Sequence, residues 1–199
     1  MTPARRTSIL MLVAGLLTLA SLACNMPAPR LGGPRPPRQA VQPSVDALES
    51  FNEKWRALNL ATPDGPFTLT FTEAELTSVV AAALEQAEAD SGTPLPVQDV
   101  QVILQDGAIY AYGTANIDPI QVNGLIVAAP TIGPDGRVSI AIRSVEFGPL
   151  EIDPELIDEI AASVEASINA PLQASSASIV LTDITISDGQ LTISGTITP

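Results

Sequence analysis

The sequence predicts an α+β fold in which an antiparallel sheet packs with amphipathic helices. Apolar residues recur at helical spacing in two segments, one after Thr72 and one after Asp153. Most of the remaining chain alternates apolar and polar residues with period two, as do strands with one solvated face. Three Asp-Gly pairs, at Asp106, Asp135 and Asp188, predict hairpin turns, because glycine accepts a positive φ without strain.

The first of the two helices is expected to run from Thr72 to about Gly92. Thr72 and Glu75 have the spacing of a capping box, and Gly92 is a helix terminator. A shorter apolar stripe predicts another helix after Ser44, and it consists of Val45, Leu48, Phe51, Trp55 and Leu58. The turn TPDGP separates this helix from a strand at 67–71. The apolar face of the helix after Thr72 consists of Leu76, Val79, Val80, Ala83, Leu84 and Ala87.

The second helix is expected to begin at Pro154. Asp153 is its N-cap, acidic residues fill its first turn, and Pro171 is expected to end it. Its apolar face consists of Leu156, Ile157, Ile160, Ala161, Val164 and Ile168.

Two segments of the chain resemble each other. Residues 105–115 (QDGAIYAYGTA) and 187–197 (SDGQLTISGTI) share the pattern Asp-Gly, alternating apolar residues, then Gly-Thr. Each follows a strand and a helix, so the sequence predicts pseudo-repeated strand-helix-hairpin units. Convergence on a common hairpin solution would produce the same pattern.

Composition bounds the chemistry of this chain of 199 residues. It contains no histidine and one cysteine, which excludes an internal disulfide and a Cys/His metal site. The commonest general base is absent, as are a G-x-S-x-G motif and a phosphate-cradling loop. We therefore expect no enzyme, and no catalytic residue, metal or cofactor is assigned.

Two short motifs have structural explanations. The sequence DSGT at 90–93 matches the aspartic protease signature, but it follows the polar end of a helix and has no second copy. The acidic residues between Asp153 and Glu159 suit a helix N-terminus, and no glycine-bearing loop of oxygen ligands surrounds them.

Charge divides the chain into a basic beginning and an acidic remainder. The formal net charge is −13, and after Ala57 only Arg137 and Arg143 are basic. Such a surface repels phosphate backbones, so nucleic acid is excluded as a partner. Solubility is the simpler explanation of the acidic surface.

The N-terminus is typical of an export signal. Arg5 and Arg6 precede an apolar run that is shorter than a membrane-spanning helix needs, and the run ends at Cys24. Residues 1–23 resemble a bacterial lipoprotein signal, which implies that Cys24 is acylated, with palmitate for example, and becomes the mature N-terminus. An ordinary cleaved signal with a bystander cysteine and an uncleaved anchor are the alternatives.

The segment after Cys24 predicts a spacer. Residues 24–43 are rich in proline and carry Arg30, Arg35 and Arg38, so they form a stiff, basic tether suited to anionic headgroups. A plain disordered linker is the other interpretation. A single domain is expected at 44–199, with its core at 67–198. The protein is expected to be extracytoplasmic and anchored to the cell membrane.

Both helices are rich in small residues, which either leave room for acyl chains or let helix and sheet approach closely. The region 67–197 resembles bacterial envelope domains of the LmeA and YpmS type, relatives of the tubular lipid-binding (BPI-like) superfamily. The segments FTLTFTEAELTSVV, DGRVSIAIRSVEFGPLEIDPELIDEI and IVLTDITISDGQLTISGTI carry this resemblance. It implies a curved antiparallel sheet wrapped around the helices and enclosing an apolar groove.

The resemblance implies a protein that binds, or transfers, phospholipid or another apolar ligand. The expected groove wall consists of Leu76, Val79, Val80, Ala83, Leu84, Leu156, Ile160 and Val164. Several of these residues would serve equally as plain core. The alternative function is a non-catalytic scaffolding lipoprotein that docks a protein partner, and a third hypothesis, a hydrolase, has no visible nucleophile site.

Overall fold

A computed structural model describes residues 30–37, 40–60, 65–117, 120–151, 153–174 and 178–198. The chain divides into two compact units, Met1–Arg30 and Leu31–Pro199. The second unit is described below. The signal segment and Cys24 lie outside the described residues.

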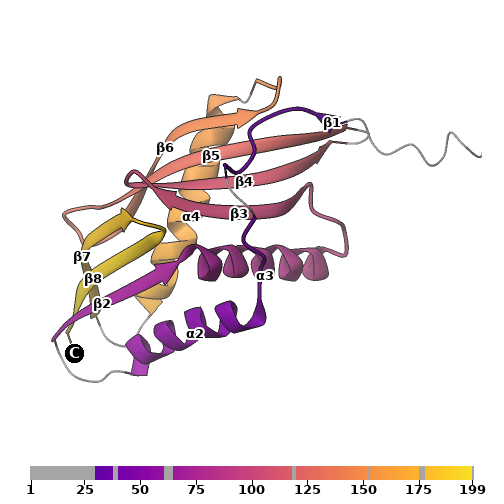
Figure 1. Ribbon diagram of the computed structural model, residues 1–199. Coiled ribbons are helices and arrows are strands. Elements are labelled where there is room, and N and C mark those ends of the chain that lie inside the picture. Colours follow the sequence, from indigo (N-terminus) through magenta and orange to yellow (C-terminus); the bar gives the residue numbers. More distant parts are fainter. Residues whose placement is uncertain are drawn as a thin grey trace, which may run out of the picture. The chain divides into compact units, whose positions relative to one another are not determined.

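The unit is an α+β structure with two antiparallel sheets (Figure 1). The strands of the larger sheet follow one another through hairpins, so that β3 and β6 border it on either side. A two-residue strand, β1, also pairs with β5. The bounds are β1 Arg30–Leu31, β3 Val97–Gln105, β4 Ala108–Ile117, β5 Ile120–Ile132 and β6 Val138–Phe147.

The smaller sheet has the strand order β2-β8-β7. Its central strand is the last strand of the chain, so β2 is held by residues more than a hundred positions later. Such pairing fixes the beginning of the domain to its end. The bounds are β2 Gly65–Thr72, β7 Ser178–Ser187 and β8 Gln190–Thr198.

Three helices are described: α2 Val45–Leu60, α3 Glu73–Ser91 and α4 Pro154–Ala174. The capping box of α3 is confirmed, because the Thr72 side chain accepts from the Glu75 N–H and the Glu75 side chain accepts from the Thr72 N–H. Gly92 ends α3 in the left-handed conformation, as expected. Asp153 caps α4 by accepting a hydrogen bond from the Glu155 N–H.

Two details of the helices differ from expectation. The helix α4 continues past Pro171 to Ala174, because a proline removes one backbone hydrogen bond without preventing the following residues from remaining helical. Val45, expected on the apolar face of α2, is 69% exposed because it is the first residue of the helix.

The hairpins at two Asp-Gly pairs have the expected two-residue form. Asp106 and Gly107 both have positive φ and join the paired residues Gln105 and Ala108. Asp188 and Gly189 repeat this geometry between β7 and β8. The third pair lies in a longer connection between β5 and β6, where the Gly133 N–H donates to the Arg137 carbonyl.

The core lies where one face of the smaller sheet meets one face of the larger sheet and α2. One cluster joins Phe71 of β2 to Val102 and Leu104 of β3, and a second joins Leu181 of β7 to Val138 and Ile140 of β6. Trp55 of α2 packs against both clusters. Burying a side chain as large as Phe71 contributes about 1.5–3 kcal/mol, so these contacts hold the two sheets together.

The helices α3 and α4 lie along the borders of the larger sheet. In α3, Thr77 accepts from the Val102 N–H at 3.0 Å and Glu73 from the Leu104 N–H at 2.8 Å. In α4, Asn169 accepts from the Val138 N–H and donates to the Val138 carbonyl. Glu165 accepts from the N–H of Ile140, two residues further along β6. Side chains one helical turn apart thus satisfy alternate backbone groups of an edge strand.

This arrangement corrects the expected architecture. No curled sheet wrapped around the helices is found in the described part of the chain, because the helices close strand edges and the smaller sheet covers the face. The order strand, helix, hairpin does occur twice, as β2-α3-β3-β4 and β6-α4-β7-β8. The first hairpin belongs to the larger sheet and the second to the smaller.

Candidate functional site

A groove of about 590 Å³ lies between α3, β3 and the segment that leads into α2. Its volume is within the range of small-ligand sites, and it is open to solvent. Its lining residues are Ala40, Val41, Gln42 and Pro43; Ala81, Leu84, Glu85 and Glu88 of α3; and Val97, Gln98, Asp99, Val100 and Gln101 of β3. A second hollow, of about 510 Å³, shares Glu85 and Glu88 with it.

The groove forms where β3 becomes irregular. The first two turns of α3 are held against β3 by the hydrogen bonds to Val102 and Leu104. The β3–β4 register then shifts between Gln98 and Gln101, and Asp99 adopts a positive φ of 53°. Such a bulge re-aims side chains and interrupts regular pairing. The second half of α3 and the bulge therefore face each other across the groove.

The third wall is the chain before α2. The Ser44 N–H donates to the Ser78 Oγ at 3.0 Å, which holds this segment on α3. Further back, Gly33 lies so close to the Asn123 carbonyl oxygen that a Cβ would clash with it, and the Gly148 nitrogen is also near. Residues 40–43 are thus part of the domain's site.

Gln101 is the buried polar residue of the groove. It is 4% exposed, and its Nε2 has no hydrogen-bond partner among the described residues. Gln101 is paired with Tyr112 of β4, so the two side chains share a sheet face. Burial raises the pKa of the Tyr112 phenol above its ordinary value, and Tyr110 and Glu146 nearby add to the rise.

The charged side chains among the described lining residues of the groove are all acidic. Glu85 and Asp99 are exposed, and the half-buried Glu88 accepts a hydrogen bond from the Leu95 N–H at 2.8 Å. No lysine or arginine is among the described lining residues. The site therefore combines apolar walls, an unpartnered amide donor and an acidic rim.

The residues expected to form one groove wall lie in different environments in the structure. Leu84 lines the groove, whereas Leu76 and Val80 pack against the core cluster around Phe71. Val79 is half-buried and Ala83 is exposed. The side chains of three further expected wall residues of α4 lie outside the described set, namely Leu156, Ile160 and Val164.

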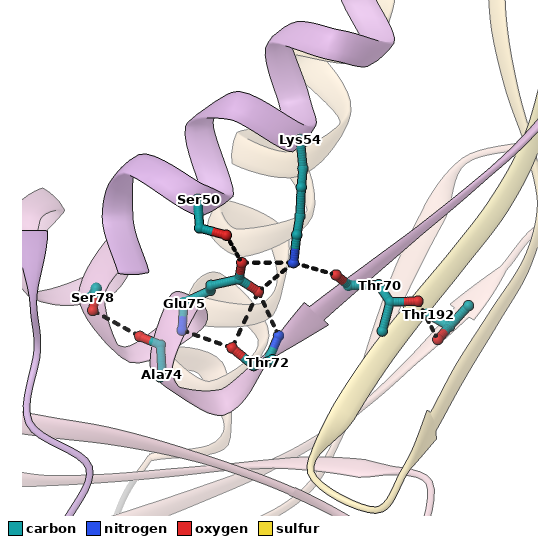
Figure 2. A network of polar contacts seen from close by, with 8 residues as sticks. All are labelled: Ser50, Lys54, Thr70, Thr72, Ala74, Glu75, Ser78 and Thr192. Carbon is teal, nitrogen blue, oxygen red and sulfur yellow. Dashed lines mark hydrogen bonds and ion pairs between the residues drawn. The ribbon is translucent and has the colours of Figure 1, made fainter. Parts of the chain in front are cut away.

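A buried polar network explains why the other face of α3 is polar (Figure 2). The Glu75 carboxylate accepts from the Ser50 hydroxyl at 2.5 Å and pairs with the Lys54 ammonium at 2.6 Å. Lys54 also donates to the Thr70 carbonyl at 2.8 Å, so one carboxylate joins α2, α3 and β2. Burial raises the pKa of Glu75, but the hydrogen bonds from Lys54, Ser50 and the Thr72 N–H outweigh it and lower the pKa overall.

Sequence reasoning missed most of the groove. Val97, Val100 and Gln101 lie in a stretch for which the sequence predicts only the alternation of a strand, and residues 40–43 lie in the predicted tether. A bulge at Asp99 and a carbonyl contact at Gly33 leave no periodic signal. Among the expected wall residues whose side chains the structure describes, Leu84 alone lines the groove.

The described part of the chain contains neither a cluster suited to a metal ion nor a helix suited to span a membrane. No group of three or more acidic or cysteine side chains within it is placed to hold a metal ion. None of its helices combines the length and the apolar character needed to cross a membrane.

Comparisons with protein-family models, with curated proteins and with solved structures find no match to this chain.

Proposed function

We propose that this protein is a membrane-anchored, extracytoplasmic lipoprotein that binds an apolar ligand, such as a phospholipid, in the α3–β3 groove. The groove carries the proposal, because Ala81, Leu84, Val97 and Val100 offer apolar walls in a hollow of small-ligand size. The lipoprotein-like signal ending at Cys24 supplies the location. The ligand class follows the sequence resemblance to tubular lipid-binding proteins, although the wrapped sheet that this resemblance implies is not found in the described residues.

The mechanism is reversible burial without covalent chemistry. Each methylene group removed from water contributes about 0.8 kcal/mol, so an acyl chain gains affinity in proportion to the length that the groove covers. Acyl chains on Cys24 would keep the groove close to the bilayer from which a ligand is taken. The arginines at 30, 35 and 38 favour the surface of an anionic membrane.

Docking of a protein partner receives less support. Large apolar side chains that are exposed among the described residues are Val45, Leu150 and Val180, which lie on α2, the β6–α4 connection and β7. Single exposed apolar residues are normal on a soluble surface and do not form a docking patch.

The test is native mass spectrometry of the full chain purified in detergent, followed by lipid extraction. We expect a stoichiometric apolar adduct, and we expect Leu84→Trp to reduce its occupancy about tenfold, because the indole fills the groove. Leu150→Trp, the same change at an exposed site outside the groove, is the matched control. A clean unliganded mass after incubation with membrane lipids would overturn the proposed function.

A further inference from the structure

The unpartnered amide of Gln101 indicates one chemical feature of the ligand. A buried N–H donor without an acceptor is costly, so a ligand oxygen that reaches it gains that lost hydrogen bond. Carbonyl and hydroxyl oxygens accept such a bond and are tolerated in an apolar groove. A pure hydrocarbon would leave the Gln101 amide unsatisfied.

The acidic rim indicates a second feature. Glu85 and Asp99 come from opposite walls of the groove, one from α3 and one from the β3 bulge. Like charges repel an anionic headgroup, whereas an ammonium group between the walls is attracted by both. Glu88 adds to the negative potential although it already accepts from the Leu95 N–H.

Resting on the proposed function, we propose that the groove selects cationic amphiphiles. The apolar chain lies against Leu84, Val97 and Val100, and a carbonyl oxygen accepts from Gln101 Nε2. An ammonium group beyond that carbonyl pairs with the rim carboxylates. Aminoacylated or amine-bearing lipids have this chemistry, whereas anionic phospholipids and free fatty acids do not.

Three synthetic probes separate the features. They are the dodecanamides of ethylenediamine, ethanolamine and glycine, which share an acyl chain and an amide carbonyl but end in an ammonium, a hydroxyl and a carboxylate. Binding to the full chain, held in a non-ionic amphipathic polymer, is measured by native mass spectrometry. We expect the ammonium probe to bind about fivefold more tightly than the hydroxyl probe and the carboxylate probe to bind most weakly. The preference is expected to shrink at high salt.

Two sets of variants test the residues. In the double variant Glu85→Gln with Asp99→Asn, the ammonium probe is expected to lose its preference, while the hydroxyl probe binds as before. Asparagine tolerates the positive φ at position 99, so the fold is expected to persist. Glu155→Gln with Asp158→Asn changes the net charge equally at exposed positions of α4 and is expected to leave both affinities unchanged.

Gln101→Leu is expected to affect stability and probe binding differently, which a purely structural role of Gln101 would not do. Because Gln101 Nε2 has no hydrogen-bond partner among the described residues, replacement of the side chain is expected to keep or raise the urea midpoint while weakening all three probes about fivefold. A lower midpoint with unchanged probe binding would overturn the role of Gln101. Equal binding of the three probes would overturn the cationic preference and leave the proposed function standing, whereas binding of none would overturn both.

Discussion

At the scale of single residues, Glu75 joins elements that the chain order separates. Its carboxylate contacts Ser50 and Lys54 of α2 and the Thr72 N–H at the start of α3. The carboxylate side chain is 5% exposed and that of Lys54 34% exposed, so the negative end of the pair is the buried end. A buried carboxylate is tolerated here because its oxygens are satisfied.

Replacing Glu75 is expected to change stability in a pH-dependent way. Its folded pKa is lower than the ordinary value of 4.5, so the unfolded chain binds the proton first as the pH falls. The stabilisation is therefore complete above about pH 4.5 and is lost as the pH falls through the folded pKa. We expect Glu75→Gln to cost about 1–3 kcal/mol of unfolding free energy at neutral pH and progressively less in acid.

Urea denaturation of both proteins across this pH range measures the difference. Glu53→Gln, an exposed change on the same helix as Lys54, is the matched control and is expected to have little effect. A constant difference between Glu75→Gln and the wild type down to about pH 3 would contradict the role of the charged form.

Gly113 and Gly195 occupy matching places in the two similar segments, 105–115 and 187–197, but their surroundings are packed differently. A Cβ on Gly195 would lie 2.6 Å from the Val180 carbonyl oxygen and 2.7 Å from the Phe67 ring. A Cβ on Gly113, at the matching place in the other segment, would make ordinary contacts of 3.5 Å. The Gly-Thr motif therefore occupies a crowded position in β8 and a roomy one in β4.

We expect Gly195→Ala to lower the unfolding free energy by about 1–3 kcal/mol, because backbone and ring must both move. Gly113→Ala is expected to be neutral or slightly stabilising, since alanine is less flexible when unfolded. Thermal and urea unfolding of the two variants measure this. Equal losses would mean that the two positions are packed alike after all.

At the scale of elements, side chains of the helices replace missing strand partners. Asn169 supplies both an acceptor and a donor to Val138, as a neighbouring strand would. Thr77 and Glu73 supply acceptors to alternate residues of β3. Covering an edge in this way prevents it from pairing with another chain.

Asn169→Leu is expected to remove both hydrogen bonds at similar volume and to cost about 2 kcal/mol of unfolding free energy. Hydrogen exchange should accelerate at the Val138 amide, and the exposed edge should promote self-association in gel filtration. Ala166→Ser, a change at an exposed position of the same helix, is the control. Unchanged exchange at Val138 would show that α4 does not protect this edge.

The sequence predicts helix ends and turns better than it predicts the sheet to which each strand belongs. The capping box at Thr72, the terminator Gly92 and the Asp-Gly turns depend on local backbone chemistry, so the sequence predicts them correctly. The sheet to which each hairpin belongs depends on contacts between distant residues, such as β2 with β8, and no periodicity specifies them. The expected apolar face of α3 was correct only in part: Leu76 and Val80 pack on the core and Leu84 lines the groove, whereas Ala83 and Ala87 are exposed. The buried residues of this helix are polar, namely Glu73, Glu75, Thr77 and Ser78.

At the scale of the whole molecule, charge and attachment act together. The formal net charge is −13, although three arginines follow Cys24 within the next fourteen residues. An acidic domain is repelled from an anionic surface, so electrostatics alone would hold only the basic segment there. Under the proposed function, we therefore expect stable attachment to depend on acyl chains at Cys24.

Cys24→Ala is expected to release the protein from membranes. Each methylene group of an acyl chain contributes about 0.8 kcal/mol to membrane binding. A single acyl chain therefore gives only marginal membrane binding, whereas two or three chains hold a protein on the membrane stably. Membrane fractions washed with carbonate measure the effect, and Cys24→Ser serves as a second variant of the same chemistry. Persistent membrane association of both variants would favour an uncleaved apolar anchor at 1–23. A groove that still binds ligand in the released protein would show that attachment and binding are separable functions.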